Sequence, residues 1–166
     1  IQLVKLSKKD FQTPISKPVT ISRRVNKSIN LSDIKFTKEG ENTIEAGANA
    51  VEAPFIFKHG DYYYLFVSFD YCCRGEKSTY KTVYGRSKNI EGPYLDKAGK
   101  PMEHGGGTFL YGPNKEYFGV GHNSAYHFDG KPYFVSHAYV KAEEGRAKLF
   151  IRPMEFDSEG WIVVKA

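Results

Sequence analysis

Two residues of the chain stand out because their types could support acid–base or metal chemistry and their positions match. Glu52 lies eight residues before Gly60, and His122 lies eight residues before Gly130. A carboxyl group can donate or accept a proton, and an imidazole can do the same or bind a metal ion. If the two segments are equivalent, both side chains face one space and form a candidate site. The alternative interpretation is two ordinary polar residues at strand starts.

The elements that would position this pair are strands. Short apolar and aromatic segments alternate with Gly, Pro and Asp turn signals, and no segment has a convincing helical period. Pro132 stands at the first position of one such segment, where its missing N–H is tolerated. We expect strands over residues 1–6, 18–22, 51–57, 61–69, 78–87, 107–111, 122–128, 132–139, 147–152 and 161–164, and a loop over 23–49.

The last eight expected strands form two similar sets of four, with hairpin glycines 70 residues apart at Gly60 and Gly130. Recurring four-stranded antiparallel units are typical of β-propeller blades, and a β-sandwich is the competing architecture. The fold class is therefore all-β. We divide the chain into the end of a preceding blade plus a loop (1–48), a blade carrying Glu52 (49–112) and a blade carrying His122 (113–166).

Composition limits the remaining classes. The 166 residues are 40% hydrophobic and 26% charged, which fits a globular domain rather than a disordered chain. The net charge of +5 is spread along the chain, and no nucleic-acid-binding motif is visible. The longest apolar run, 62–67, is far shorter than the roughly 18 residues of a membrane span. Neither nucleic acid nor a membrane is an expected partner.

Cys72 and Cys73 are adjacent. Sequence neighbours rarely bond to each other, so we expect two small buried side chains and no disulfide framework. No zinc pattern accompanies them. The chain begins without Met inside an apolar run, and the compartment is not readable from this end.

Several motifs together resemble one family. Residues 49–56 (NAVEAPFI) resemble the general-acid motif of family 43 glycoside hydrolases, and residues 62–75 resemble its endo-1,5-α-L-arabinanase branch. Further segments follow in the order typical of that branch: 78–80 (STY), 85–87 (GRS), 92–94 (GPY), 105–108 (GGGT), 121–124 (GHNS), 137–139 (HAY) and 160–161 (GW). The resemblance covers residues 49–166 closely and 1–48 loosely.

The resemblance implies a five-bladed β-propeller, of which this chain would supply two to three blades, and inverting hydrolysis of α-1,5-arabinan. Glu52 takes the position of the general acid. The general base and the Asp that tunes the acid would belong to blades upstream; Glu45 imitates the acid motif but lacks its Pro. Inversion needs an acid and a base on opposite faces of the sugar with room for water. The acid must stay protonated near neutral pH, which burial or a neighbouring carboxylate promotes.

By the same resemblance, His122 holds a single metal ion with water completing the shell. Calcium is the expected ion, although it prefers six to eight oxygen ligands over imidazole. His137 is expected to be a structural neighbour. Asp70, Tyr71, Cys73 and Arg74 lie in a loop that borders the substrate cleft in similar enzymes. They would contact sugar, or alternatively pack to support Glu52.

The expected partners are arabinan or arabino-oligosaccharide, together with the missing N-terminal half or a second copy of the chain to cover exposed blade faces. Polymer substrates indicate a secreted or periplasmic location. Two alternatives stay open: a non-catalytic carbohydrate-binding propeller, and an exo-acting arabinofuranosidase or xylosidase of the same fold. Alone, the chain is expected to be inactive because it lacks the base.

Overall fold

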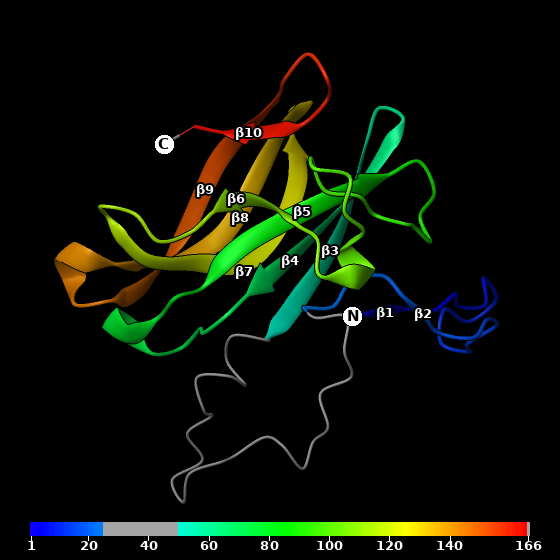
Figure 1. Ribbon diagram of the computed structural model, residues 1–166, viewed down its shortest axis with the longest axis horizontal. Coiled ribbons are helices and arrows are strands. Elements are labelled where there is room, and N and C mark those ends of the chain that lie inside the picture. Colours follow the sequence, from blue (N-terminus) through cyan, green and yellow to red (C-terminus); the bar gives the residue numbers. More distant parts are fainter. Residues whose placement is uncertain (25–49, 166) are drawn as a thin grey trace, which may run out of the picture.

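The computed structural model describes residues 1–24 and 50–165, so most of the expected loop 23–49, including Glu45, lies outside the described residues. The described chain is built from strands and three short 3₁₀ turns (Figure 1). The strands are β1 (Gln2–Leu3), β2 (Val19–Thr20), β3 (Val51–His59), β4 (Tyr62–Phe69), β5 (Lys81–Ser87), β6 (Thr108–Tyr111), β7 (Tyr117–Phe128), β8 (Lys131–Val140), β9 (Arg146–Phe156) and β10 (Ile162–Val164). The turns are η2 (Gly75–Lys77), η3 (Met102–His104) and η4 (Lys141–Glu143).

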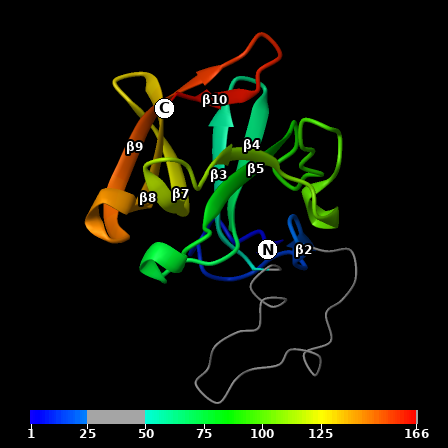
Figure 2. The ribbon, with the colours of Figure 1, turned by 60° about the vertical axis from the view of Figure 1, so that its left-hand side comes forward.

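Two four-stranded antiparallel sheets dominate the structure, in the orders β3-β4-β5-β6 and β7-β8-β9-β10. Each strand pairs with its neighbour in sequence, so each sheet is a simple up-and-down meander. The first strands of the sheets, β3 and β7, contact each other, and the sheets fan apart from there (Figures 1 and 2). The sheets fall within the predicted segments 49–112 and 113–166, and β1 pairs with β2 in a separate two-stranded sheet.

The main core lies between the two sheets and is largely aromatic. Phe66 and Phe134 are fully buried there, and Tyr111 packs against Phe150 with ring centroids 4.8 Å apart. The Arg86 guanidinium of β5 lies 3.8 Å from the ring centroid of Trp161, which directly precedes β10 of the second sheet. Burial of this apolar surface holds the two sheets face to face.

Every expected strand is present, but several bounds differ: β1 and β2 are only two residues long, β5 begins at Lys81 rather than at residue 78, and β9 continues to Phe156 rather than ending at residue 152. The largest difference in the second sheet is at the start of β7. β7 begins at Tyr117 rather than at His122, and Tyr117 pairs with Val140. Gly119 and Gly121 weaken the strand pattern in the sequence. In the structure both glycines are buried against Tyr80, and a Cβ at Gly121 would overlap the Tyr80 ring. These glycines therefore mark a close approach between strands rather than a turn.

The two sheets repeat at 69 residues, not at the 70 inferred from the glycines. The hairpin of the first sheet turns at residues 60–61 and that of the second at 129–130, so Gly60 corresponds to Asp129. Both β3 and β7 carry a bulge, between Glu52 and Phe55 and between Gly121 and Ser124. His122 therefore corresponds to Ala53, and Glu52 to Gly121. The equivalence that first paired Glu52 with His122 is wrong by one residue.

No helix within residues 1–24 and 50–165 is long and apolar enough to cross a membrane.

Candidate functional site

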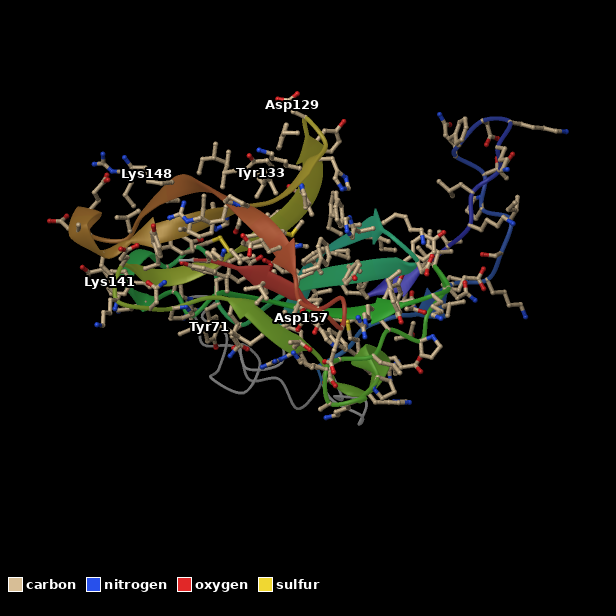
Figure 3. All side chains as sticks on the ribbon, turned by 90° about the horizontal axis from the view of Figure 1, so that it is seen from above. Tyr71, Asp129, Tyr133, Lys141, Lys148 and Asp157 are labelled. Carbon is tan, nitrogen blue, oxygen red and sulfur yellow. A yellow bond between two sulfur atoms is a disulfide. The ribbon has the colours of Figure 1, made fainter. Side chains whose placement is uncertain are left out.

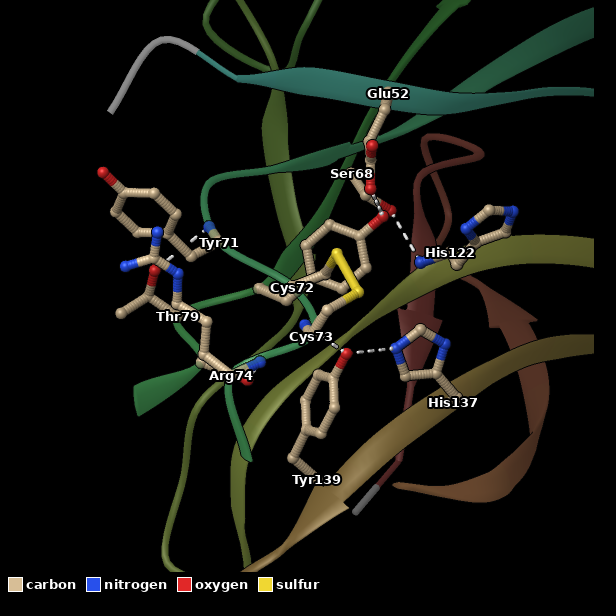
Figure 4. The surroundings of a disulfide bond; sticks show 12 residues. Glu52, Ser68, Tyr71, Cys72, Cys73, Arg74, Thr79, His122, His137 and Tyr139 are labelled. Carbon is tan, nitrogen blue, oxygen red and sulfur yellow. Dashed lines mark hydrogen bonds between the residues drawn. A yellow bond between two sulfur atoms is a disulfide. The ribbon is translucent and has the colours of Figure 1, made fainter. Parts of the chain in front are cut away.

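Glu52 stands at the start of β3, directly opposite Ser68 of β4 and just before the β3 bulge. Its side chain is exposed, and the Tyr80 hydroxyl donates a hydrogen bond to its Oε1 (Figure 4). Ala53, the next residue, has the left-handed φ of 51°. Bulges redirect side chains at sheet edges, and here the bulge follows the carboxyl-bearing residue immediately.

Tyr80 is a site residue that the sequence analysis did not identify. It is fully buried between the sheets, and burial, with the neighbouring Glu52 carboxylate, raises the pKa of its hydroxyl far above the ordinary value of 10. The phenol therefore stays protonated and serves as a donor. It holds the Glu52 carboxyl group through Oε1. The sequence signals for Tyr80 are the segment 78–80 (STY), to which no role was assigned, and the glycines Gly119 and Gly121 that make room for the ring.

His122 lies in the β7 bulge with a left-handed φ of 53°, a conformation that few non-glycine residues adopt. Its side chain is exposed, and its backbone N–H donates to Ser68 Oγ at 2.9 Å. This bond replaces the ladder partner that the bulge removes. The bond thus places the His122 backbone beside β4, the strand that pairs with β3 at Glu52.

The ring of His137, on β8, lies near both His122 and Tyr80. Its ring centroid lies 6.4 Å from that of His122 and 5.7 Å from that of Tyr80. Its Nε2 lies 3.0 Å from the Tyr139 hydroxyl. Burial lowers the pKa of His137, and the nearby His122 lowers it further. The ring is half-buried beside His122 and Tyr80.

The loop after β4 runs beside this cluster. Both carboxylate oxygens of Asp70 are engaged, since Oδ1 lies 2.7 Å from Arg24 and Oδ2 lies 2.7 Å from Lys81. The Arg74 guanidinium stacks on the Tyr71 ring at 4.1 Å. The ion pairs fix the start of the loop, and the stacked pair forms its half-exposed rim.

Cys72 and Cys73 form a disulfide with each other, contrary to the expectation of two unpaired buried side chains. Cys73 is exposed and has a left-handed φ of 62°, and its N–H donates to the Tyr139 hydroxyl at 2.6 Å. The loop backbone thus adopts a conformation in which adjacent sulfurs meet, which residue spacing alone does not reveal. Cys73 thus lies beside Tyr139, whose hydroxyl also contacts His137 (Figure 4).

The residues around His122 offer one exposed imidazole to a metal ion. Within residues 1–24 and 50–165, no group of three or more His, Cys, Asp or Glu side chains is placed to hold one. A single imidazole fits an ion whose other ligands are water, and the hydrogen-bonded His122 backbone would hold that imidazole in place. This donor set does not form a full calcium shell.

The arrangement can hold one carboxyl group in a fixed orientation at the junction of two blade-like sheets, where it could protonate a leaving oxygen. The structure brings Glu52 and His122 to neighbouring strands, with the loop of Asp70, Tyr71, Cys73 and Arg74 beside them. Two adjacent four-stranded antiparallel meanders define the class of fold: this chain forms part of a β-propeller.

Comparison with known proteins specifies the family. The family model described as "Glycosyl hydrolases family 43" matches residues 16–162 of this chain. The chain belongs to this family.

Two curated relatives, named as an arabinofuranosidase and an arabinanase, are similar to this chain. The chain is 54% identical over 117 residues to an extracellular exo-α-(1→5)-L-arabinofuranosidase of Cellvibrio japonicus, covering 70% of this chain and 34% of the relative. It is 42% identical over 142 residues to an extracellular endo-α-(1→5)-L-arabinanase of Bacillus subtilis, covering 78% and 43%.

A solved arabinanase of Cellvibrio cellulosa in complex with arabinohexaose superimposes with a TM-score of 0.84 at 43% identity, covering 99% of this chain and 49% of that one. The chain spans about half the length of such relatives, and its two sheets match half of their five-bladed propeller.

Proposed function

We propose that this chain supplies the general-acid half of an arabinan-hydrolysing site, with Glu52 as the acid. The observation that carries the proposal is the Tyr80 hydroxyl bound to Glu52 Oε1 at the inner end of β3. Relatives named as arabinanases and arabinofuranosidases support the substrate class.

Glu52 would protonate the glycosidic oxygen as the bond to the sugar breaks, and a water activated by a base on the opposite face would attack the anomeric carbon with inversion. The base would come from blades outside this chain. In the loop beside Glu52, Asp70 is already held by two cations, which fits a supporting role better than that of a base.

Replacing Glu52 by Gln in the complete propeller should test this role. The amide cannot donate an acidic proton, so we expect the turnover of arabinan to fall by about 10²–10⁴-fold. Turnover of an aryl arabinoside should fall much less, because a good leaving group hardly needs protonation.

Glu155→Gln is the matched control, since Glu155 is an exposed carboxylate of β9 paired with Lys165. It should behave as wild type with both substrates. Equal losses on the two substrates in Glu52→Gln would show that Glu52 only positions the sugar. Binding of arabino-oligosaccharide without hydrolysis by the complete wild-type propeller would favour the non-catalytic alternative.

The mode of action divides into two candidates. The motif of residues 62–75 favours endo action, whereas the Cellvibrio japonicus relative is named an exo-acting enzyme. Product analysis separates them, because an endo enzyme shortens long arabinan early and an exo enzyme releases one small product throughout. A xylosidase activity would show itself on xylo-oligosaccharides.

We further propose that Tyr71, Arg74 and the Cys72–Cys73 disulfide border the bound sugar and that His122 holds one metal ion with water, calcium being the expected ion. The metal would add a fixed positive charge near the reacting sugar. An extracellular or periplasmic location is supported by the disulfide, since disulfides persist in oxidising compartments, and by the names of both curated relatives.

A further inference from the structure

Ser68 is a fully buried hydroxyl at the centre of the site. It lies on β4 directly opposite Glu52 and accepts the backbone N–H of His122 at 2.9 Å. The Ser68 hydroxyl also faces the Tyr80 hydroxyl, whose pKa it lowers, and Tyr80 in turn donates to Glu52. One side chain therefore contacts both halves of the candidate site (Figure 4).

The proton of Ser68 has two competing acceptors. Ser68 Oγ lies 3.1 Å from Asn123 Oδ1 and also contacts Tyr80. If the proton goes to Asn123, the Nδ2 of that buried amide has no partner within the described part of the chain. Turning the amide by 180° lets its nitrogen donate to Ser68 Oγ, and the Ser68 proton becomes available to Tyr80.

The bonds then run in one direction. The His122 N–H and the Asn123 amide donate to Ser68, Ser68 donates to Tyr80, and Tyr80 donates to Glu52. Aligned hydrogen bonds polarise and strengthen one another in a buried setting. We propose that Ser68 is a positioning residue that fixes the Tyr80 hydroxyl on Glu52 while its oxygen holds the His122 bulge in place.

This inference rests on the proposed role of Glu52 as an acid, and its first test uses the complete propeller. Ser68→Ala should lower turnover of arabinan by up to roughly tenfold, the upper end of the effect of one neutral hydrogen bond. It should lower turnover of an aryl arabinoside much less. Ser87→Ala is the matched control, since Ser87 is also buried and accepts one backbone N–H, that of Asn89 at 3.0 Å, far from Glu52.

A double-mutant cycle asks whether Ser68 acts through Tyr80. In a Tyr80→Phe background the hydroxyl between Ser68 and Glu52 is gone, so Ser68→Ala should cause a much smaller loss of arabinan turnover than it causes in the wild-type background, and the remaining loss comes from the His122 bulge. Fully additive losses, or equal losses on both substrates, would overturn the proposal. Ser68→Thr, which keeps the hydroxyl, should retain activity that Ser68→Val, of the same shape, loses. Equal activities of Thr and Val variants would also overturn it.

A last readout does not depend on hydrolysis. Amide hydrogen exchange of His122, measured by NMR, should accelerate in Ser68→Ala and Ser68→Val but not in Ser68→Thr or Ser87→Ala. Unchanged exchange would overturn the proposed hold on the bulge. If Glu52→Gln shows no dependence on leaving group, the acid role fails, and this measurement still decides whether Ser68 holds His122.

Discussion

At the scale of residues, the site is built from side chains that hold other groups in place. Tyr80 orients the Glu52 carboxyl, and Ser68 binds the backbone of His122. Both holding residues are fully buried, whereas both held side chains are exposed. Buried partners with few alternative conformations can fix an exposed group precisely enough for chemistry.

The metal proposal makes a prediction at this scale. Because His122 is the one imidazole proposed as a ligand, His122→Ala should weaken calcium binding at least about tenfold in isothermal titration calorimetry of the complete propeller. His104→Ala is the control, since His104 is exposed in η3 and its Nε2 lies 3.8 Å from the Glu103 carboxylate. Calcium binding that survives His122→Ala would place the ion elsewhere.

At the scale of elements, stacked rings join the strands of the two sheets at the end opposite Glu52. His59 of β3 stacks on Phe156 of β9 with ring centroids 4.0 Å apart, and it lies 5.7 Å from His127 of β7. Burial lowers the pKa of His59 below its ordinary value of 6.5, and repulsion from His127 lowers it further. Protonation would therefore place charge in a stacked contact between sheets.

The sign of the resulting pH dependence follows from this lowered pKa. The unfolded chain takes up a proton near pH 6.5, before the folded chain does, so the free energy of unfolding should be highest above pH 6.5 and fall as the pH drops toward the folded pKa. Chemical denaturation between pH 8 and 5 should show this decline. His59→Phe, which keeps the stack, should reduce it.

The decline should not vanish in His59→Phe, because His137 has a lowered pKa and acts with the same sign. His104→Phe is the control for loss of a histidine elsewhere and should leave the decline as in wild type. An identical decline in His59→Phe and wild type would contradict the role given to His59.

At the scale of the whole molecule, the second sheet buries one face and exposes the other. Phe150 of β9 is buried against the first sheet, whereas Leu149 beside it is 74% exposed, and Tyr126 of β7 is 63% exposed. In Figure 3, Asp129 marks the tip of the β7–β8 hairpin, and Lys148 lies nearer the other end of this sheet. Exposed apolar patches mark interaction sites, and we expect further blades of the propeller to cover this face.

Light scattering tests this expectation on the chain alone. The apolar face should make the chain associate, and Leu149→Glu should reduce association because it places a charge in the centre of the contact. Phe109→Glu is the control, since Phe109 is 59% exposed but lies on β6, the outer strand of the first sheet. The isolated chain should also lack arabinan hydrolysis. A monodisperse wild-type chain that hydrolyses arabinan would contradict both the missing base and the uncovered face.

Local features of the sequence determined the strands, the meander order and the position of Glu52. Aromatic and β-branched segments bounded by Gly, Pro and Asp specify strands and tight turns through contacts within a few residues. The same local signals gave a repeat length that is one residue too long, because the repeat was measured between glycines. The left-handed turn position taken by Gly60 in the first hairpin is taken by Asp129, not by a glycine, in the second.

Tertiary structure alone decided what holds the site together. Tyr80 reaches Glu52 across 28 residues, Ser68 reaches His122 across 54, and Tyr139 reaches Cys73 across 66. The Cys72–Cys73 disulfide likewise depends on a loop conformation held by distant partners. Such contacts form when separate strands pack together, and their partners are set by sheet register and burial, which no local pattern contains.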